Sequence, residues 1–264
     1  MLAKPLPDDR ALFWWRSLCV LAVVNICMWL AVWKFAPISN FYSAMQLGLS
    51  GVYVLVCAYR SFLPRIDLER LVVIDSRLSS IFAGRVAATV AEICFGIQLG
   101  LLVYQLGANA GLEWIQKAAW AVPIFLTAAQ FFCWHSILTL NHITQAVESL
   151  LWAAGFSWIA ALLAVVAMDT NGVVQVVAAA GIVASVAFVV YVLGVDVPMY
   201  VRRFRDGKAL GLRYLSIRQG ARDAMERRVA SHSWEKWKSD ALWLTPYFSA
   251  GVWISIALVF VPGD

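Results

Sequence analysis

The chain has 264 residues, a formal net charge of +5 and a hydrophobic fraction of 62%, while charged residues make up only 14%. A soluble domain carries about 25% charged residues, so the composition excludes an ordinary soluble protein and indicates an integral membrane protein. Seven spans of about 20 apolar residues, with their loops, account for the whole length. The sequence therefore predicts a single all-α domain over residues 1–264, a bundle of about seven transmembrane helices.

Seven apolar segments are long enough to cross a membrane. They lie at residues 17–33, 41–59, 83–106, 118–140, 145–168, 173–195 and 241–261. The stretch from Ala119 to Met168 must fold back on itself, because one helix of that length exceeds a hydrocarbon core of about 30 Å. We expect its turn at residues 140–144, so that the fourth and fifth spans form a hairpin. The sixth span is expected to end near Asp196, because Pro198 follows.

The two polar segments between spans carry helical patterns. Residues 60–80 have an N-cap candidate at Asp67 followed by apolar residues at helical spacing, which predicts a short interfacial helix. Residues 199–240 form a longer basic loop. Its apolar residues from Leu210 to Met225 recur at helical spacing, which predicts a basic amphipathic helix.

The basic face of this helix is a candidate lipid-binding surface. The arginines expected at the lipid surface are Arg213, Arg218, Arg222, Arg227 and Arg228. Anionic lipid attracts each basic residue near the surface by about 1 kcal/mol, although the same residues also satisfy ordinary membrane topology. Nucleic acid is not an expected partner, because the basic face carries no recognisable nucleic-acid-binding module.

Lysine and arginine are distributed very unequally between the two sides of the predicted bundle. One side holds three of them in the N-terminal segment, five from Arg60 through Arg85 and eleven in residues 199–240, whereas the other holds only Lys34 and Lys117. The positive-inside rule then places the N-terminus in the cytoplasm and, since seven is odd, the C-terminus outside. We expect a multi-pass protein of the bacterial inner (plasma) membrane.

In this orientation, ionisable residues from separate spans reach the cytoplasmic half of the membrane. Arg85 begins the third span, and Glu92 lies two helical turns, about 10 Å, deeper on the same face. The hairpin brings three more, His135, His142 and Glu148, close to its turn. Because a carboxylate facing lipid is costly, we expect the acidic residues to face the bundle interior. These five residues are the candidate catalytic residues.

Three interpretations of this group remain open. His135, His142 and Glu148 can act as ligands of a transition metal, although the sequence has no H-E-x-x-H or E-x-x-H motif. Alternatively, a His–Glu pair can serve as general acid and base while Arg85 holds an anionic head group. The groups can also satisfy one another across helices and fix the helix register. The cofactor is therefore left undetermined.

Three classes of function also remain open, and the sequence does not establish whether the protein is an enzyme. A membrane-embedded enzyme acting on a lipid-phase substrate at the cytoplasmic leaflet is favoured, because the ionisable group lies at head-group depth. A secondary transporter is the alternative, although no internal repeat is visible. A non-catalytic assembly or accessory subunit would use faces of small residues to bind helix partners or a second copy. The small residues concerned are Gly96, Gly100, Ala180 and Ala184.

Overall fold

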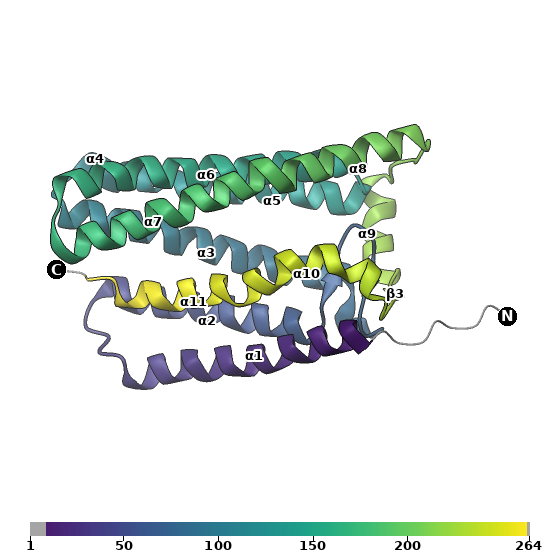
Figure 1. Cartoon of the computed structure of the whole chain (residues 1–264), viewed down its shortest axis with the longest axis horizontal. Helices are drawn as coiled ribbons and strands as arrows, with labels where there is room; N and C mark the ends of the chain where they lie inside the picture. The colour runs from purple at the N-terminus through teal and green to yellow at the C-terminus, as the bar shows by residue number, and fades with distance from the viewer. Residues whose placement is uncertain (1–8, 263–264) are drawn as a thin grey trace.

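The computed structural model describes residues 9–262; residues 1–8, which include Lys4 of the predicted cytoplasmic charge, and residues 263–264 lie outside this part. In the described part, seven helical segments are long and apolar enough to cross a membrane. These segments run side by side along the long axis of the molecule (Figure 1). The predicted all-α bundle of seven transmembrane helices is confirmed.

Four of the spans are single uninterrupted helices. They are α1 (Asp9–Phe35), α2 (Phe41–Phe62), α3 (Ile81–Asn109) and α6 (His142–Asp169). α3 packs against both α2 and α5, so it occupies the middle of the bundle. Its central position explains why so many of its side chains are buried, and it carries both Arg85 and Glu92.

Two spans are interrupted. The fourth comprises α4 (Glu113–Ala119) and α5 (Ala121–Thr139), and the seventh comprises α10 (Trp234–Phe248), α11 (Ala250–Ala257) and the 3-10 turn η3 (Leu258–Phe260). Pro246 lies inside α10, and the helix breaks three residues later at Ser249. Proline donates no backbone hydrogen bond and crowds the turn before it, so Pro246 weakens the helix just ahead of the break.

The hairpin turn between the fourth and fifth spans lies where the sequence predicts it. Leu140 adopts a left-handed backbone conformation, with φ 60° and ψ 30°, and ends α5. Asn141 then caps α6, because its side-chain oxygen accepts a hydrogen bond from the N–H of Ile143. The turn therefore fixes the ends of α5 and α6 next to each other.

The sixth helix continues past Asp196, so the predicted end was wrong. α7 (Gly172–Tyr191) passes through a π-helical turn, η2 (Val192–Asp196), into α8 (Val197–Ala209). The N–H of Val197 bonds the carbonyl of Val192, five residues back. Pro198 thus falls in the first turn of α8, after a locally widened stretch of helix, where a missing N–H is tolerated.

The interfacial helix predicted for residues 60–80 is absent from the described chain. After α2, the strand β1 (Arg65–Ile66) pairs antiparallel with β2 (Leu71–Val72), and the 3-10 turn η1 (Arg77–Ser79) precedes α3. β3 (Val229–Ala230) adds to β2 in parallel. Pro64 and the left-handed φ of Arg70 oppose a helix here, and the distant strand β3 supplies hydrogen-bond partners that sequence pattern does not reveal.

Residues 199–240 hold the end of α8, all of α9 (Ile217–Glu226) and the start of α10, so the single helix predicted from Leu210 to Met225 was correct only for its second half. α8 ends at Ala209, and Gly211 turns the chain with φ 66°. α9 then begins with a capping box made by Ser216 and Gln219. α8 and α9 lie at the same end of the bundle (Figure 1).

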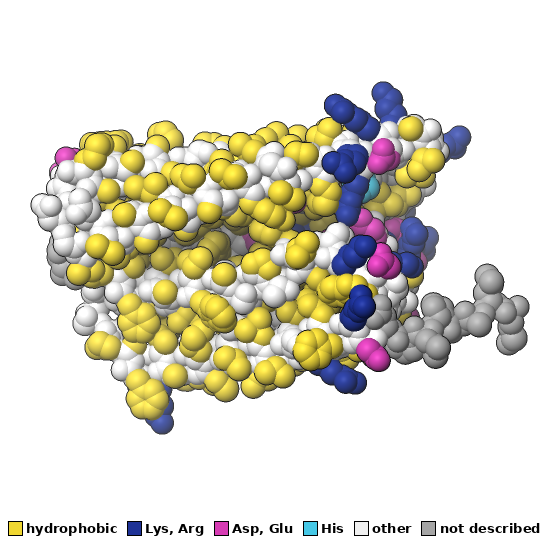
Figure 2. Space-filling model, in the orientation of Figure 1, with side chains coloured by type: hydrophobic (Ala, Val, Ile, Leu, Met, Phe, Trp, Pro, Cys, Tyr) yellow, Lys and Arg dark blue, Asp and Glu magenta, His cyan; other side chains and the backbone are white. Residues whose placement is uncertain are grey.

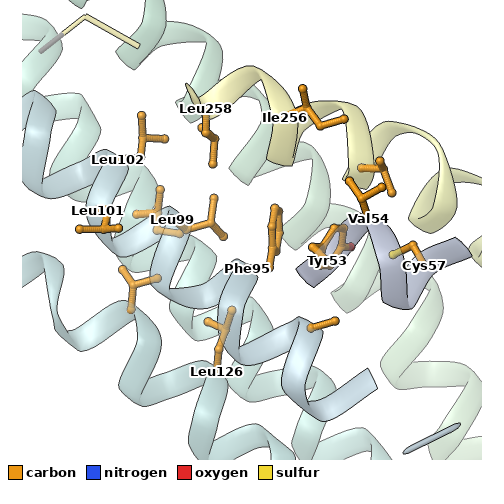
Figure 3. Packing of buried hydrophobic residues seen from close by; sticks show 14 of the residues in the cluster. Tyr53, Val54, Cys57, Phe95, Leu99, Leu101, Leu102, Leu126, Ile256 and Leu258 are labelled. Atoms are coloured by element: carbon orange, nitrogen blue, oxygen red, sulfur yellow. The ribbon is translucent and has the colours of Figure 1, made fainter. Parts of the chain in front are cut away.

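The core includes buried apolar side chains from every span, with the largest share from α3, and Figure 3 shows part of this packing. The rings of Tyr53 and Phe95 stack with centroids 5.0 Å apart. Gly96 and Gly100 allow α3 to approach α5: an added Cβ would lie 3.2 Å from Leu126 and 3.0 Å from Pro123, respectively.

This packing occupies part of the predicted partner surface. Gly96 and Gly100 face α5 of the same chain, and their part in binding a separate partner stays a prediction. Ala180 and Ala184 on α7 are exposed, so a helix partner or second copy at that face stays a prediction.

Candidate functional site

Basic side chains gather at one end of the bundle. Figure 2 shows lysine and arginine side chains concentrated where α8, α9 and β3 lie, which we call the basic end. α1 begins at this end, and η3 lies at the opposite one. The distribution agrees with the one-sided charge of the sequence, while the assignment of the basic end to the cytoplasm stays a prediction.

A buried ion pair lies inside the bundle towards this end. Nη2 of Arg85 lies 2.5 Å from Oε2 of Glu92, and the two side chains are 6% and 8% exposed. The same Arg85 nitrogen donates to Oε1 of Gln130 on α5 at 2.9 Å. The hydroxyl of Tyr247 on α10 donates to Oε1 of Glu92 at 3.3 Å. We call Arg85, Glu92, Gln130 and Tyr247 the charged cluster, in which α3, α5 and α10 meet.

Two further arginines are buried beside this cluster. Arg60, at the end of α2, is 8% exposed, and its guanidinium lies over the rings of Tyr247 and Phe248 at 5.6 and 5.8 Å. Arg65 in β1 is 2% exposed and donates to the carbonyl of Ser80 at 2.6 Å. Sequence reasoning placed both only as basic residues of the cytoplasmic side, because nothing in the local pattern indicates burial.

Arg65 has little compensation for its burial. Its guanidinium lies 4.9 Å from the centre of the Tyr59 ring, and an added Cβ on Gly84 would collide with it. Burial lowers the pKa of the Arg65 guanidinium, although Tyr59 and Asp67 act in the opposite direction. A side chain in place of Gly84, in the first turn of α3, would therefore displace the Arg65 guanidinium from this position.

Glu148 lies in an adjoining polar group rather than in a histidine pair. The side-chain N–H of Gln145 donates to Oε2 of Glu148 at 2.7 Å, and the Gln145 amide contacts the sulfur of Cys133. Glu148 is buried and lies within electrostatic reach of Glu92 and Arg85. The prediction that Glu92 and Glu148 face the interior is therefore consistent with their positions.

The two histidines do not join these carboxylates. Nδ1 of His135 lies 3.2 Å from the hydroxyl of Thr144, and the side chain is exposed. The half-buried ring of His142 lies 6.5 Å from that of Tyr200. The predicted His–Glu pair was wrong, because His135 follows the buried Cys133 by two positions and so points away from it on the helix.

The predicted metal ligands are separated in the same way. His135, His142 and Glu148 have different neighbours, and within residues 9–262 no three side chains of His, Cys, Asp or Glu converge to hold a metal ion. The sequence spacing across the turn was misleading, because the left-handed residue Leu140 interrupts the helical periodicity on which it relied.

A groove between α7 and α10 leads towards the charged cluster. Figure 2 shows acidic and basic side chains behind apolar ones along this groove. Tyr191 of α7 stacks on Trp243 of α10, with centroids 5.7 Å apart and planes 8° apart. Trp243 is 38% exposed, and its ring lies 6.0 Å from that of Tyr247, which bonds Glu92. A row of aromatic rings thus connects the membrane-facing surface with the buried carboxylate.

A cavity of about 460 Å³ opens at the basic end between the small sheet, α8 and α10. It is lined by Ile66, Glu69, Leu71, Arg203, Val229, Glu235, Lys236, Ser239 and Asp240. Arg203 pairs with Glu69 at 2.9 Å across it. Burial raises the pKa of the Glu69 carboxyl, and Arg203 partly opposes the increase. The cavity is large enough for a small polar ligand or a head group.

Arg70 holds this end together. It is fully buried and donates to Oδ2 of Asp223 at 2.8 Å, to the carbonyl of Asp67 at 2.7 Å and to that of Ile137 at 2.8 Å. These bonds join the β1–β2 turn to α5 and α9. α9 also contacts α5 so closely that an added Cβ on Gly220 would collide with a backbone carbonyl.

Most arginines of the predicted lipid surface remain exposed on this docked segment. Arg213, Arg218, Arg222 and Arg227 are exposed, whereas Arg228 is partly buried and pairs with Asp75 at 2.8 Å. α9 is attached to the bundle through its small residues and keeps these basic side chains on its outer surface, where Arg222 pairs with Glu226 at 3.4 Å and Arg227 with Asp223 at 3.7 Å. Their binding to anionic lipid stays a prediction.

The chain matches no protein-family model, and no curated protein or solved structure is similar to it. Its class therefore follows from the fold and the site alone. It is a multi-pass helical membrane protein with a buried, charged side-chain cluster near its basic end.

Proposed function

We propose that the protein is a membrane-embedded enzyme that acts on a lipid-phase substrate at the cytoplasmic leaflet, in a membrane such as the bacterial inner membrane. The observation that carries the proposal is the buried Arg85–Glu92 pair with the Tyr247 hydroxyl against it. The groove between α7 and α10, which the stacked rings of Tyr191 and Trp243 bridge, is the proposed lateral route from the bilayer to these groups. Ionisable residues inside a membrane bundle are rare because their burial is costly, and they usually mark functional sites.

The cluster has the parts needed for proton transfer. Glu92 is the proposed general base, because it is the carboxylate to which both a cation and a hydroxyl are bound. Arg85 stabilises negative charge, and Gln130 orients it by accepting one of its N–H groups. Tyr247 lies between the aromatic row and Glu92, so it is positioned to pass or donate a proton as the substrate arrives.

A secondary transporter is the second candidate. Buried polar side chains continue along α3 from Glu92 to Gln98, and Gln98 bonds Ser255 of α11. These polar side chains extend deeper into the membrane than a reaction at a lipid head group would require. Two observations distinguish the candidates. If the protein converts a lipid, the enzyme is favoured; if it moves a solute across the membrane and leaves the lipid composition unchanged, the transporter is favoured.

The enzyme proposal is tested with lipid extracts of a host that produces the wild-type protein, Glu92→Gln or Glu113→Gln. Glu113 is exposed at the opposite end and serves as the matched control. We expect a lipid species to accumulate or disappear with the wild type and the control, and the rate of that change to fall by about 100-fold or more in Glu92→Gln, the weight of a general base. Full lipid conversion by Glu92→Gln at equal protein level would contradict the role of Glu92.

A further inference from the structure

Arg60 is a buried cation without an anionic partner. Its guanidinium lies against two aromatic rings of α10, and its side chain makes no hydrogen bond or ion pair within residues 9–262. Its Nε is buried and unbonded. The neighbouring Arg65 uses one nitrogen on the Ser80 carbonyl, while its Nε and Nη2 are also buried and unbonded.

The nearby carboxylates do not balance these charges. Glu92 is committed to Arg85, which leaves Asp67 within electrostatic reach of both Arg60 and Arg65. Oδ1 of Asp67 is itself buried without a hydrogen bond. Glu148 also acts on Arg85, so Arg60 and Arg65 share Asp67 as the one nearby carboxylate that is not paired with another group. Burying a charge without a partner is strongly unfavourable, so a site of this composition calls for an anion.

We infer that Arg60 and Arg65 bind the phosphate oxyanion of a membrane lipid. The planar guanidinium presents several N–H donors in a fixed fork that matches phosphate oxygens, and three such nitrogens here have no protein partner. Arg60 lies against Tyr247, which borders the aromatic row at the α7–α10 groove. In the proposed complex the head group lies against the arginines, and its acyl chains lie between the apolar walls of the groove.

This inference deepens the proposed function and rests on it, since it names the substrate class of the same site. The phosphate places the lipid so that its reacting group lies near Glu92, because Tyr247 contacts both Arg60 and Glu92. The aromatic rings under Arg60 offer the alternative in which cation–π contacts alone compensate for its burial. The two alternatives differ in whether an anion binds.

The test uses the purified full-length protein, stripped of lipid in a neutral detergent. Dioleoyl phosphatidic acid supplies a lipid phosphate, dioleoylglycerol the same chains without it, and inorganic phosphate the free anion. We expect phosphatidic acid to raise the melting temperature saturably, and the other two to leave it unchanged. An equal shift with dioleoylglycerol would overturn the anion site, and an equal shift with inorganic phosphate would overturn its lipid source.

Variants then assign the site. Arg60→Gln should bind phosphatidic acid about tenfold or more weakly, the weight of one charge-assisted hydrogen bond, and should melt no lower than the wild type without lipid. Arg205→Gln, which removes an exposed charge from α8 outside the predicted lipid surface, should bind normally. Unchanged affinity in Arg60→Gln, or an equal loss in Arg205→Gln, would overturn the assignment.

Arg60→Lys keeps the test decisive if Arg60→Gln does not fold. It retains the charge but lacks the fork, so its affinity should fall several-fold, and unchanged affinity would reject the role of Arg60. Failure of this inference is distinguishable from failure of the proposed enzyme. Glu92→Gln should still bind phosphatidic acid although it converts no lipid, whereas lipid conversion without phosphate-dependent binding would reject the inference alone.

Discussion

Two buried polar groups in this bundle are built in opposite ways. The charged cluster near the basic end contains an ion pair and has Arg60 and Arg65 beside it. The second group, which we call the amide cluster, consists of Gln46, Gln98 and Ser255 from α2, α3 and α11, all of them fully buried. Both groups join α3 to its neighbouring helices. A comparison of the two therefore distinguishes the contacts that hold the helices together from the features that a bound ligand would explain.

The amide cluster is neutral and nearly complete. Nε2 of Gln98 donates to the carbonyls of Gln46 and Ser255 at 3.2 and 3.0 Å, and the Ser255 hydroxyl donates to Oε1 of Gln98 at 2.6 Å. Nε2 of Gln46 donates to the Gln98 carbonyl at 3.0 Å, which leaves Oε1 of Gln46 without a bond. Such interhelical hydrogen bonds account for close packing without any functional requirement.

The two arginines beside the charged cluster are not satisfied in this way. Arg60 and Arg65 carry charge into the interior and leave donors unused, which stability alone would not select. The difference indicates that the amide cluster serves to hold the helices together, whereas the arginines at the basic end require an anion that the chain itself does not supply.

The largest effect is expected from Arg85→Met, which removes one partner of the buried ion pair. We expect a loss of about 3–5 kcal/mol, because Glu92 is left as an uncompensated buried charge. The measurement is thermal unfolding in detergent. The double variant Arg85→Met with Glu92→Leu should recover most of the loss, since replacing both partners by apolar groups is often neutral. A double variant as unstable as the single one would show that the pair itself does not determine the cost.

Gln98→Leu should have a smaller effect and of a different kind. It removes two donated bonds and one accepted bond from the amide cluster, for an expected cost of about 1–3 kcal/mol. Lipid conversion per folded molecule should be unchanged, because the amide cluster is structural. Activity lost at full stability in Gln98→Leu would break the comparison and favour the transporter.

The smallest effect is expected from His135→Ala. The side chain is exposed and its one recorded bond is to Thr144, so the free energy of unfolding should change by no more than about 0.5 kcal/mol. Activity should be retained as well. Loss of lipid conversion at wild-type stability would restore the histidine to the catalytic group that the sequence predicts.

Much of the fold follows from simple features of the sequence. Apolar length alone locates the seven spans, and the hairpin at Leu140 follows because one helix cannot contain its fifty residues. The Arg85–Glu92 pair follows from two helical turns on one face. These features depend on chain length and helical geometry, which tertiary contacts do not alter.

The remaining features depend on contacts between distant segments. The burial of Arg60 requires α10, and β2 forms because β3 arrives from more than 150 residues away. His135 was misplaced because charge type says nothing about which helix face points inwards when both faces are apolar. The continuation of α7 past Pro198 depends on a local π turn, which no composition rule predicts.

The central claim is that the arginines beside the charged cluster hold a lipid phosphate, and an experimental map of the wild-type protein in a bilayer nanodisc containing phosphatidic acid tests it most directly. We predict density of phosphate size within hydrogen-bond distance of the Arg60 and Arg65 guanidinium groups, continuous with acyl chains in the α7–α10 groove. A map in which both guanidinium groups are bonded only by protein groups or water, with the groove filled by side chains, would contradict the account.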